Sequence, residues 1–286
     1  MRTESSRSQT TISDEDFLKF QEYFYRKTGI QFEPTKRYFV DKRILERMEA
    51  TGSDTFRSYF IMLRFQTSGE ELQQLTNSMT VNETYFFRED YQFQCMVKSM
   101  LPDIIARKKS NTPIRIWSIP SSSGEEAYSI AIHLLEYWPG ISEWDVEIIS
   151  SDIDTQIISQ ARKGLYSHRS IQHLPVNLLS KYFKKTAGGY QICEDLRESV
   201  EFTRVNLTEE ADTRGYRDFD IIFCRNLLIY FDELSRKAAA ETFYDALTPG
   251  GYLCLGHSES MSRISSIYHV QKFPEAIVYQ KPREVR

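Results

Sequence analysis

A serine-rich turn followed by two adjacent glutamates lies in the middle of the chain. The turn and the glutamates, SSSGEE at residues 121–126, follow a short β-like run at residues 114–117. A turn at the carboxyl end of a parallel strand is where open α/β sheets bind nucleotide-like ligands. The segment is neither GxGxxG nor a P-loop, and its glutamates would repel a pyrophosphate. It therefore favours a ligand that is cationic or carries amino and hydroxyl groups over NAD or ATP. In the alternative, the glutamates only stabilise the helix dipole.

Two further acidic residues follow the next apolar run, residues 146–149. Asp152 lies 28 residues after Gly124, at the position where such folds usually bind a ribose diol. Asp154 is placed to cap the helix that follows, and capping is also the alternative for Asp152. Acidic groups around a pocket that lacks a phosphate-binding device suit S-adenosylmethionine, whose sulfonium and ammonium groups are positive. We expect Asp152 to bind the ligand and Asp154 to be the cap.

Polar residues also interrupt two apolar or aromatic segments elsewhere in the chain. Cys-Arg-Asn at residues 224–226 breaks the apolar run that begins at residue 219, and Tyr230 follows soon after. Because α/β sites form at the carboxyl edge of the sheet, this interruption favours a functional role. Residues 82–89, NETYFFRE, flank an aromatic cluster with polar groups. Taken alone, that segment could be a packed linker.

Strands and helices alternate from residue 113 onward, which predicts a doubly wound parallel α/β sheet to position these residues. Two apolar runs joined by a proline-containing turn, residues 268–273 and 276–280, predict a closing antiparallel hairpin. Residues 166–200 break the alternation, and their lysine and glycine pairs at 184–189 suggest a small appended hairpin.

The first 90 residues have almost no pattern typical of strands, and their apolar spacing predicts helices. Ser13, followed by three acidic residues, indicates an N-cap, and Gly29 closes that helix. Further amphipathic segments follow at residues 36–50, 55–65 and 70–79. We expect a flexible tail at 1–12, a small all-helical domain at 13–90, a linker helix at 91–112 and an α/β domain at 113–286 with a β insertion at about 166–200.

The composition excludes several classes of protein. The 286 residues carry a net charge of −4, with 41% hydrophobic and 27% charged residues, an ordinary globular balance. No stretch approaches the roughly 18 uncharged apolar residues of a membrane span, and the start lacks a signal peptide, so we expect a cytoplasmic protein. The four cysteines form no CxxC pair, so we expect no metal site and no structural disulfide. The acidic balance argues against a nucleic-acid partner.

Six segments in chain order resemble the CheR family of chemotaxis-receptor methyltransferases, over about residues 16–280. The segments are NETYFFRE, SSSGEEAYSIAI, SDID, VNL, FCRNLLIYFD and GGYLCLGHSE. The resemblance implies a Rossmann-like methyltransferase sheet. It also implies transfer of a methyl group from S-adenosylmethionine to glutamates of cytoplasmic chemoreceptor helices, giving γ-glutamyl methyl esters and S-adenosylhomocysteine. We expect a monomer.

The resemblance also implies which residues form the site. Arg88 and Tyr230 would lie closest to the transferred methyl group. Because the acceptor glutamate, with a reference pKa of about 4.3, is already ionised at pH 7, no general base is needed. Arg88 would orient that carboxylate and Tyr230 would donate a hydrogen bond, whereas His257 is expected to be structural. By motif position, the residues around the cofactor are Asn82, Thr84, Arg88, Glu126, Asp152, Asn206, Leu207, Asn226 and Leu227.

A basic segment in the helical domain suits an acidic partner. Residues 26–47 contain seven basic and three acidic residues, a local net charge of +4 against −4 for the chain. The substrate-docking candidates are Lys36, Arg37, Lys42, Arg43 and Arg47. Because receptor methylation regions are acidic helices, charge-complementary docking is the functional interpretation. The alternative is a solvated helix face.

Two departures from the family pattern keep other functions open. Ile119 and Pro120 stand where many members have small residues, and Ala127 replaces a common proline. The alternatives are a catalytically weak regulator that binds S-adenosylmethionine and a methyltransferase for another substrate; an NAD dehydrogenase is disfavoured by the missing glycines. The turn at residues 184–189 also looks shorter than in members that bind a receptor's C-terminal peptide, so we expect no such tether.

Overall fold

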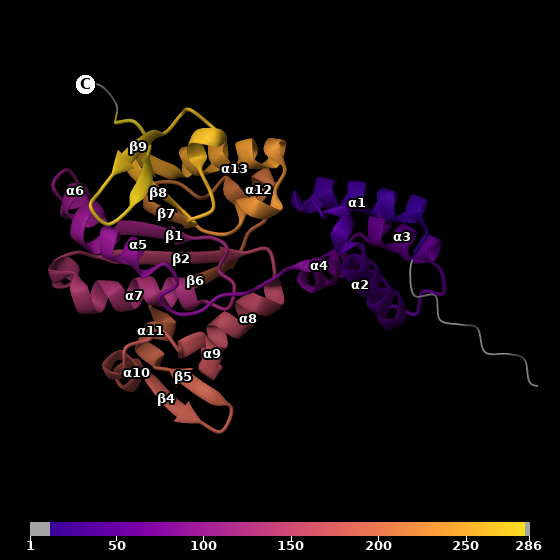
Figure 1. Cartoon of the computed structure of the whole chain (residues 1–286), viewed down its shortest axis with the longest axis horizontal. Coiled ribbons are helices and arrows are strands. Elements are labelled where there is room, and N and C mark those ends of the chain that lie inside the picture. Colours follow the sequence, from indigo (N-terminus) through magenta and orange to yellow (C-terminus); the bar gives the residue numbers. More distant parts are fainter. Residues whose placement is uncertain (1–11, 284–286) are drawn as a thin grey trace, which may run out of the picture. The chain divides into compact units, whose positions relative to one another are not determined.

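The computed structural model describes residues 12–283, which form two compact units that divide between Val81 and Asn82. The expected flexible tail lies outside the described residues except for Ile12, which is buried in the helical unit. Figure 1 labels the elements of both units.

The first unit is built of helices whose ends follow local capping rules. Ser13 accepts a hydrogen bond from the Asp16 backbone N–H at the start of α1, and Gly29 ends that helix in the left-handed conformation. The core contains phenylalanines of α1 packed against apolar residues of the later helices. The helices are α1 Asp14–Thr28, η1 Pro34–Lys36, α2 Arg37–Ala50, α3 Phe56–Phe65 and α4 Glu70–Met79. The four predicted helical segments are confirmed.

The second unit contains a seven-stranded sheet in the order β6-β2-β1-β7-β8-β10-β9. The first five strands in this order pair in parallel, and β10 pairs antiparallel with both β8 and β9. The strands are β1 Ile114–Ser118, β2 Val146–Asp152, β6 Val200–Arg204, β7 Phe219–Cys224, β8 Leu247–Leu255, β9 His269–Lys272 and β10 Ile277–Gln280. The predicted doubly wound sheet and its terminal hairpin are confirmed, but β6 is a strand that the sequence does not predict.

Helices pack on this sheet and connect its strands. Helices α7 and α8 pack against β2 and β6, and α13 packs against β8. The main helices are α5 Asp90–Cys95, the π-helix η2 Met96–Met100, α6 Leu101–Ile105, α7 Glu125–Tyr137, α8 Thr155–Lys163 and α13 Glu233–Ala246. Shorter turns are η3 Pro139–Ser142, α12 Glu210–Thr213, η4 Leu228–Tyr230 and η5 Met261–Arg263. No helix within residues 12–283 is long and apolar enough to cross a membrane.

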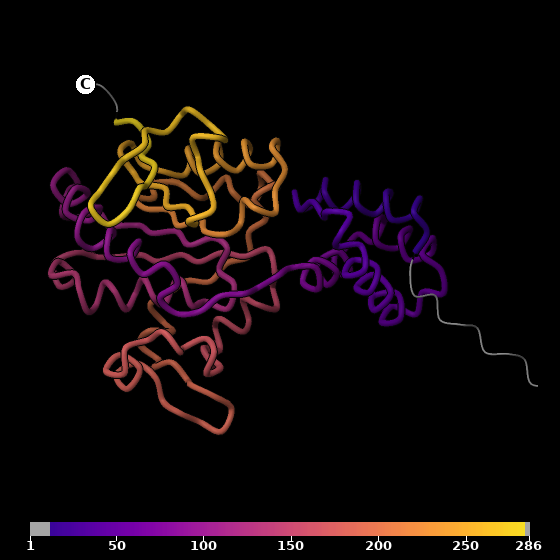
Figure 2. The backbone as a smooth tube through the Cα atoms, in the orientation of Figure 1, coloured from indigo at the N-terminus to yellow at the C-terminus, as the bar shows by residue number. Residues whose placement is uncertain are grey.

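A small antiparallel sheet, in the order β3-β5-β4, forms the predicted insertion. Its hairpin projects from the rest of the unit, as the backbone trace in Figure 2 shows. The backbone at Gly189 has a φ of 135°, and a Cβ there would lie 2.4 Å from the carbonyl oxygen of Tyr166. The elements are β3 Leu165–Tyr166, α9 His168–Ile171, α10 Val176–Tyr182, β4 Phe183–Thr186, β5 Gly189–Ile192 and α11 Glu194–Glu198.

Candidate functional site

The candidate site lies where the strand order reverses. From β1 the chain runs outward through β2 to β6 on one side and through β7 to β8 on the other. Loops after the carboxyl ends of β1 and β7 therefore separate to opposite sides, which leaves a crevice for a ligand. The predicted site residues outside the helical unit come from these two loops, from the ends of the neighbouring strands β2 and β6, and from the segment at residues 82–89 before α5.

Asp152 and Asp154 differ in their contacts, and Asp154 has the capping role that the sequence predicted for it. Asp154 is the N-cap of α8 and accepts from the backbone N–H groups of Gln156 and Ile157, which confirms the cap. Asp152 is 3% exposed and accepts from the backbone N–H groups of Ser122, at 2.8 Å, and Asp154, at 3.0 Å. Burial raises the pKa of Asp152 to about 6. Asp152 thus fastens the loop after β1 to the end of β2. Its carboxylate oxygens can still accept further hydrogen bonds.

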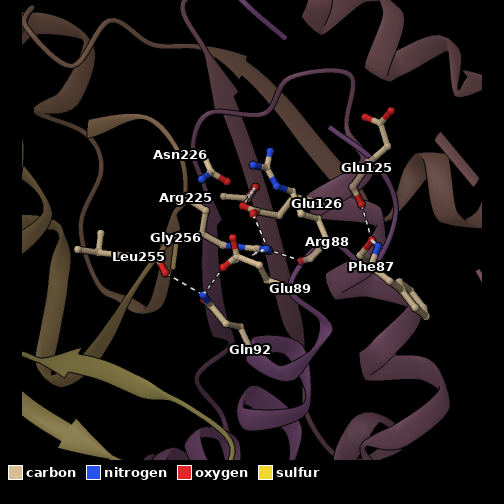
Figure 3. Close-up of polar contacts among 12 residues, drawn as sticks. Phe87, Arg88, Glu89, Gln92, Glu125, Glu126, Arg225, Asn226, Leu255 and Gly256 are labelled. Atoms are coloured by element: carbon tan, nitrogen blue, oxygen red, sulfur yellow. Dashed lines mark hydrogen bonds and ion pairs between the residues drawn. The ribbon is translucent and has the colours of Figure 1, made fainter. Parts of the chain in front are cut away.

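The two adjacent glutamates point in different directions, as Figure 3 shows. Glu125 is buried and accepts from the Ser123 hydroxyl at 2.6 Å. Glu126 faces the centre of the sheet edge, where it accepts from the Ser118 hydroxyl at 2.8 Å and from Arg225 at 3.0 Å. Burial raises the pKa of the Glu126 carboxyl, and the positive charge of Arg225 opposes that shift. Only Glu126 is therefore placed to meet a ligand at this edge.

Arg225 is the centre of a buried charge cluster. Its side chain is 2% exposed, donates one bond to Glu126 and another to the carbonyl oxygen of Arg88, and lies 3.7 Å from Glu89. Glu89 also accepts from the Nδ1 of His257 at 2.9 Å. The pKa of Glu89 is lowered although burial opposes the shift, because His257 and Arg225 stabilise its charged form.

Arg88 lies in a loop of unusual backbone conformation. Its neighbours Phe87 and Glu89 both have positive φ, 62° and 53°. The Arg88 guanidinium donates to the carbonyl oxygen of Glu83 at 3.0 Å and lies beside the Tyr85 ring. The pKa of Tyr230 is raised mainly by burial, and the charge of Arg88 opposes that shift. The positive charge of Arg88 therefore reaches the Tyr230 hydroxyl.

The loop after β7 is held by a carboxylate that the sequence analysis did not single out. Glu259 accepts from the backbone N–H groups of Asn226 and Leu228, each at 2.8 Å, and of Gly256 at 2.9 Å. Asn226 has a φ of 60°, and a Cβ at Gly256 would lie 2.9 Å from its Nδ2 atom. Glu259 and Gly256 therefore fix the position of Asn226 and, next to it, of Leu227.

The remaining predicted cofactor residues lie on flanking segments. Asn206 is buried after β6, where its side-chain oxygen accepts from Thr208, and Leu207 is 9% exposed beside it. Asn82 donates to Asp154 at 3.1 Å, and Thr84 is half-buried in the same segment. The segment at 82–89 is therefore joined to the end of β2.

The basic docking candidates divide into two groups. Arg47 makes two bonds to Glu71, which is 5% exposed, and Arg37 pairs with Asp14 and Asp41. Those contacts give both arginines partners within the helical unit. Lys36 is exposed, and Lys42 and Arg43 share the single carboxylate of Glu46. The three residues Lys36, Lys42 and Arg43 keep the larger part of the basic surface.

The residues at the sheet edge fit a ligand such as S-adenosylmethionine. Asp152 and Glu126 present carboxylates of the kind that bind hydroxyl and ammonium groups. The hydroxyls of Ser121 and Ser122 are buried without a hydrogen-bond partner among the described residues, as expected for a loop that faces a polar ligand. Within residues 12–283 there is no cluster of three or more His, Cys, Asp or Glu side chains that could hold a metal.

Comparison with known proteins finds matches along almost the whole chain. Residues 82–277 match "CheR methyltransferase, SAM binding domain" and residues 15–80 match "CheR methyltransferase, all-alpha domain". The chain is 55% identical over 278 residues to "Chemotaxis protein methyltransferase 2" of Vibrio cholerae, covering 97% of this chain and 96% of the relative. It is 36% identical to the Pseudomonas aeruginosa protein of that name (88% of this chain, 89% of the relative) and 33% identical to "Chemotaxis protein methyltransferase" of Escherichia coli (88% and 87%).

Proposed function

The chain belongs to the CheR family of S-adenosylmethionine-dependent chemotaxis methyltransferases, and from this premise we propose that it esterifies glutamate side chains of chemoreceptor helices. The observation that carries the proposal is the arrangement of two carboxylates, the buried Asp152 and the 13% exposed Glu126, at the sheet edge to which Arg88 is also fastened. When bound there, S-adenosylmethionine supplies an electrophilic methyl group.

The carboxylates and amides of this edge would hold the cofactor. Asp152 would accept hydrogen bonds from the ribose hydroxyls, and Glu126 would accept hydrogen bonds from the ammonium group. Ionised acceptors form stronger hydrogen bonds than neutral ones. The other residues that would line the cofactor are Asn82, Thr84, Asn206, Leu207, Asn226 and Leu227.

Arg88 and Tyr230 would position the acceptor. A glutamate carboxylate is ionised at neutral pH, so no residue needs to remove a proton from it. Arg88 would bind the carboxylate through charge-assisted hydrogen bonds, and the Tyr230 hydroxyl would donate another. Tyr230 keeps 38% of its surface exposed, so an approaching side chain can reach it. Alignment and the exclusion of water then supply the rate enhancement.

The helical unit would bring the receptor helices to this site. Lys36 and Lys42 are exposed and Arg43 is half-buried, and within residues 12–283 the ion pairs of Lys42 and Arg43 are both with Glu46. Acidic helices complement that surface, and such complementarity acts mainly on encounter and specificity.

The test is chemical identification of the product. The protein is incubated with methyl-labelled cofactor and receptor-containing membranes and then treated with mild alkali. Release of volatile labelled methanol is the expected result, because carboxyl methyl esters hydrolyse under these conditions. A stable label would instead indicate N- or C-methylation, and a complete lack of label would favour a regulatory protein.

A further inference from the structure

Arg225 joins the cofactor side of the site to the loop that carries Arg88. One end of its guanidinium donates to Glu126 at 3.0 Å, and the other end donates to the carbonyl oxygen of Arg88 (Figure 3). The side chain is 2% exposed. A buried arginine that bridges a side chain and a main-chain oxygen fixes the distance between them.

We propose that Arg225 is a positioning residue for methyl transfer, which acts by holding the backbone of Arg88 at a set distance from Glu126. The inference rests on the proposed function, since it concerns how Arg88 meets the acceptor carboxylate. Arg225 itself is not placed to touch the acceptor, because its side chain is 2% exposed and both of its terminal nitrogens donate within the protein.

The loop around Arg88 needs such an anchor. Positive φ is an unfavourable backbone conformation for the non-glycine residues Phe87 and Glu89. The loop is held there by contacts on several sides. The backbone N–H of Phe86 donates to the Ser170 carbonyl at 2.9 Å, and that of Phe87 donates to the Ser129 hydroxyl at 3.1 Å. Arg225 supplies the contact to Arg88 itself.

Glu89 strengthens the same anchor from the next position in the chain. Besides His257 and Arg225, its carboxylate accepts from Gln92 at 2.9 Å, and Gln92 also donates to the carbonyl oxygen of Leu255 at 2.7 Å. The backbone of the loop is thus tied to the ends of both β7 and β8. A displacement of about 1 Å at a reacting group can cost roughly 100-fold in rate, so loss of this tie is expected to lower turnover.

An arginine is required here for its shape as well as its charge. The planar guanidinium presents two donors at once and stacks over the Phe93 ring at 5.1 Å. A lysine would keep the positive charge between Glu89 and Glu126 but could not make both contacts in this geometry. The variant R225K therefore separates positioning from charge, whereas a neutral residue would also remove the positive charge that lies between Glu89 and Glu126.

Arg115 offers a matched control. Its guanidinium likewise pairs with a glutamate (Glu147, at 2.8 Å), donates to a main-chain carbonyl (Arg217) and lies over a phenylalanine ring (Phe219, at 4.6 Å). It lies near the start of β1, at the opposite end of the strand from the site. R115K makes the same chemical change away from the loop.

The experiment compares wild type, R225K and R115K in three measurements. These are kcat for receptor methylation, the Kd of S-adenosylhomocysteine by calorimetry, and amide hydrogen exchange at Phe87–Glu89. For R225K we expect kcat to fall about tenfold or more, with a smaller change in Kd and faster exchange in the loop. R115K should keep wild-type values. Wild-type kcat and exchange in a folded R225K protein would overturn the proposal.

Two further variants test the proposal if R225K does not fold or if its effect does not act through Arg88. In the R88A background, R225K should reduce kcat no further, because Arg225 acts through Arg88; additive losses would contradict this. If R225K does not fold, E89Q decides: slower turnover and faster loop exchange support the anchor, and wild-type values of both refute it. Failure of wild type to release methanol would refute the proposed function alone, since loop exchange is measured without substrate.

Discussion

Asp152, which we propose binds the ribose hydroxyls, is expected to make cofactor affinity depend on pH. Its pKa is raised to about 6 by burial, and only the ionised carboxylate can accept from two ribose hydroxyls while keeping its bonds to the loop after β1. Affinity for S-adenosylhomocysteine should therefore fall about tenfold as the pH drops from 7 to 5. D152N should bind weakly at all of these pH values. An equally steep pH dependence in D152N would assign the effect to another group.

The raised pKa of Asp152 also makes the stability of the protein depend on pH, in the direction opposite to the ligand affinity. Because the folded-state pKa of Asp152 lies above its unfolded value of about 3.8, the folded protein binds more protons between these values. This group's contribution to stability therefore decreases as the pH rises from about 4 to 6, the range in which ligand affinity recovers. Burial of the ionised Asp152 carboxylate therefore lowers the stability of the protein without ligand, and we expect ligand binding to offset this loss.

At the scale of single elements, α2 offers a test of docking. The double reversal K42E/R43E should raise the KM for receptor roughly tenfold, with little change in kcat or cofactor Kd, because it removes positive charge from the helical unit, which contains none of the residues proposed to hold the cofactor. The difference should shrink at high salt. K19E on α1, which also reverses an exposed and paired lysine, is the control. An unchanged KM in the α2 variant would rule out docking through these residues.

The small sheet depends on one glycine. In G189A the new Cβ would lie 2.4 Å from the Tyr166 carbonyl oxygen in a backbone conformation that alanine rarely adopts. We expect a loss of roughly 1–3 kcal/mol in local stability, measured as faster amide exchange in β3 and β5. G188A, at the adjoining position of the same turn, should keep wild-type exchange, because its Cβ would meet the end of the Leu165 side chain at 3.3 Å and the Thr186 hydroxyl at 4.0 Å, with no backbone atom among these contacts. Equal effects of the two substitutions would contradict this account.

Elements defined by local chemistry could be predicted from the sequence, and those defined by distant contacts could not. Ser13 and Gly29 mark α1 because caps are made by neighbouring residues. Strand β6 was missed because only Val200 and Phe202 of its five residues are buried, too short an alternation to stand out. Arg225 and Arg88 are 137 positions apart in the sequence. The motif that contains each residue could therefore be recognised, but the contact between the two residues could not be predicted. Glu259 was likewise quoted within a motif, but nothing local shows that it binds the loop after β7.

At the scale of the whole molecule, the residues proposed to hold the cofactor all belong to the second unit. A fragment that begins at Thr80 should therefore bind S-adenosylhomocysteine with a Kd within about threefold of wild type. Its KM for receptor should be much higher, because it lacks α2. Circular dichroism would show whether the fragment is folded, and a folded fragment without affinity for the ligand would mean that the helical unit contributes to the cofactor site.

The strand order also has a consequence for synthesis of the protein. Strand β8 is paired on one side by β7 and on the other by β10, which follows it in the chain and is the last strand within residues 12–283. Until β10 has emerged, one edge of β8 presents unpaired backbone groups of the kind that drive aggregation. A premature stop codon shortly before residue 277 would thus remove no residue proposed to bind cofactor or acceptor, yet its product should accumulate as insoluble protein.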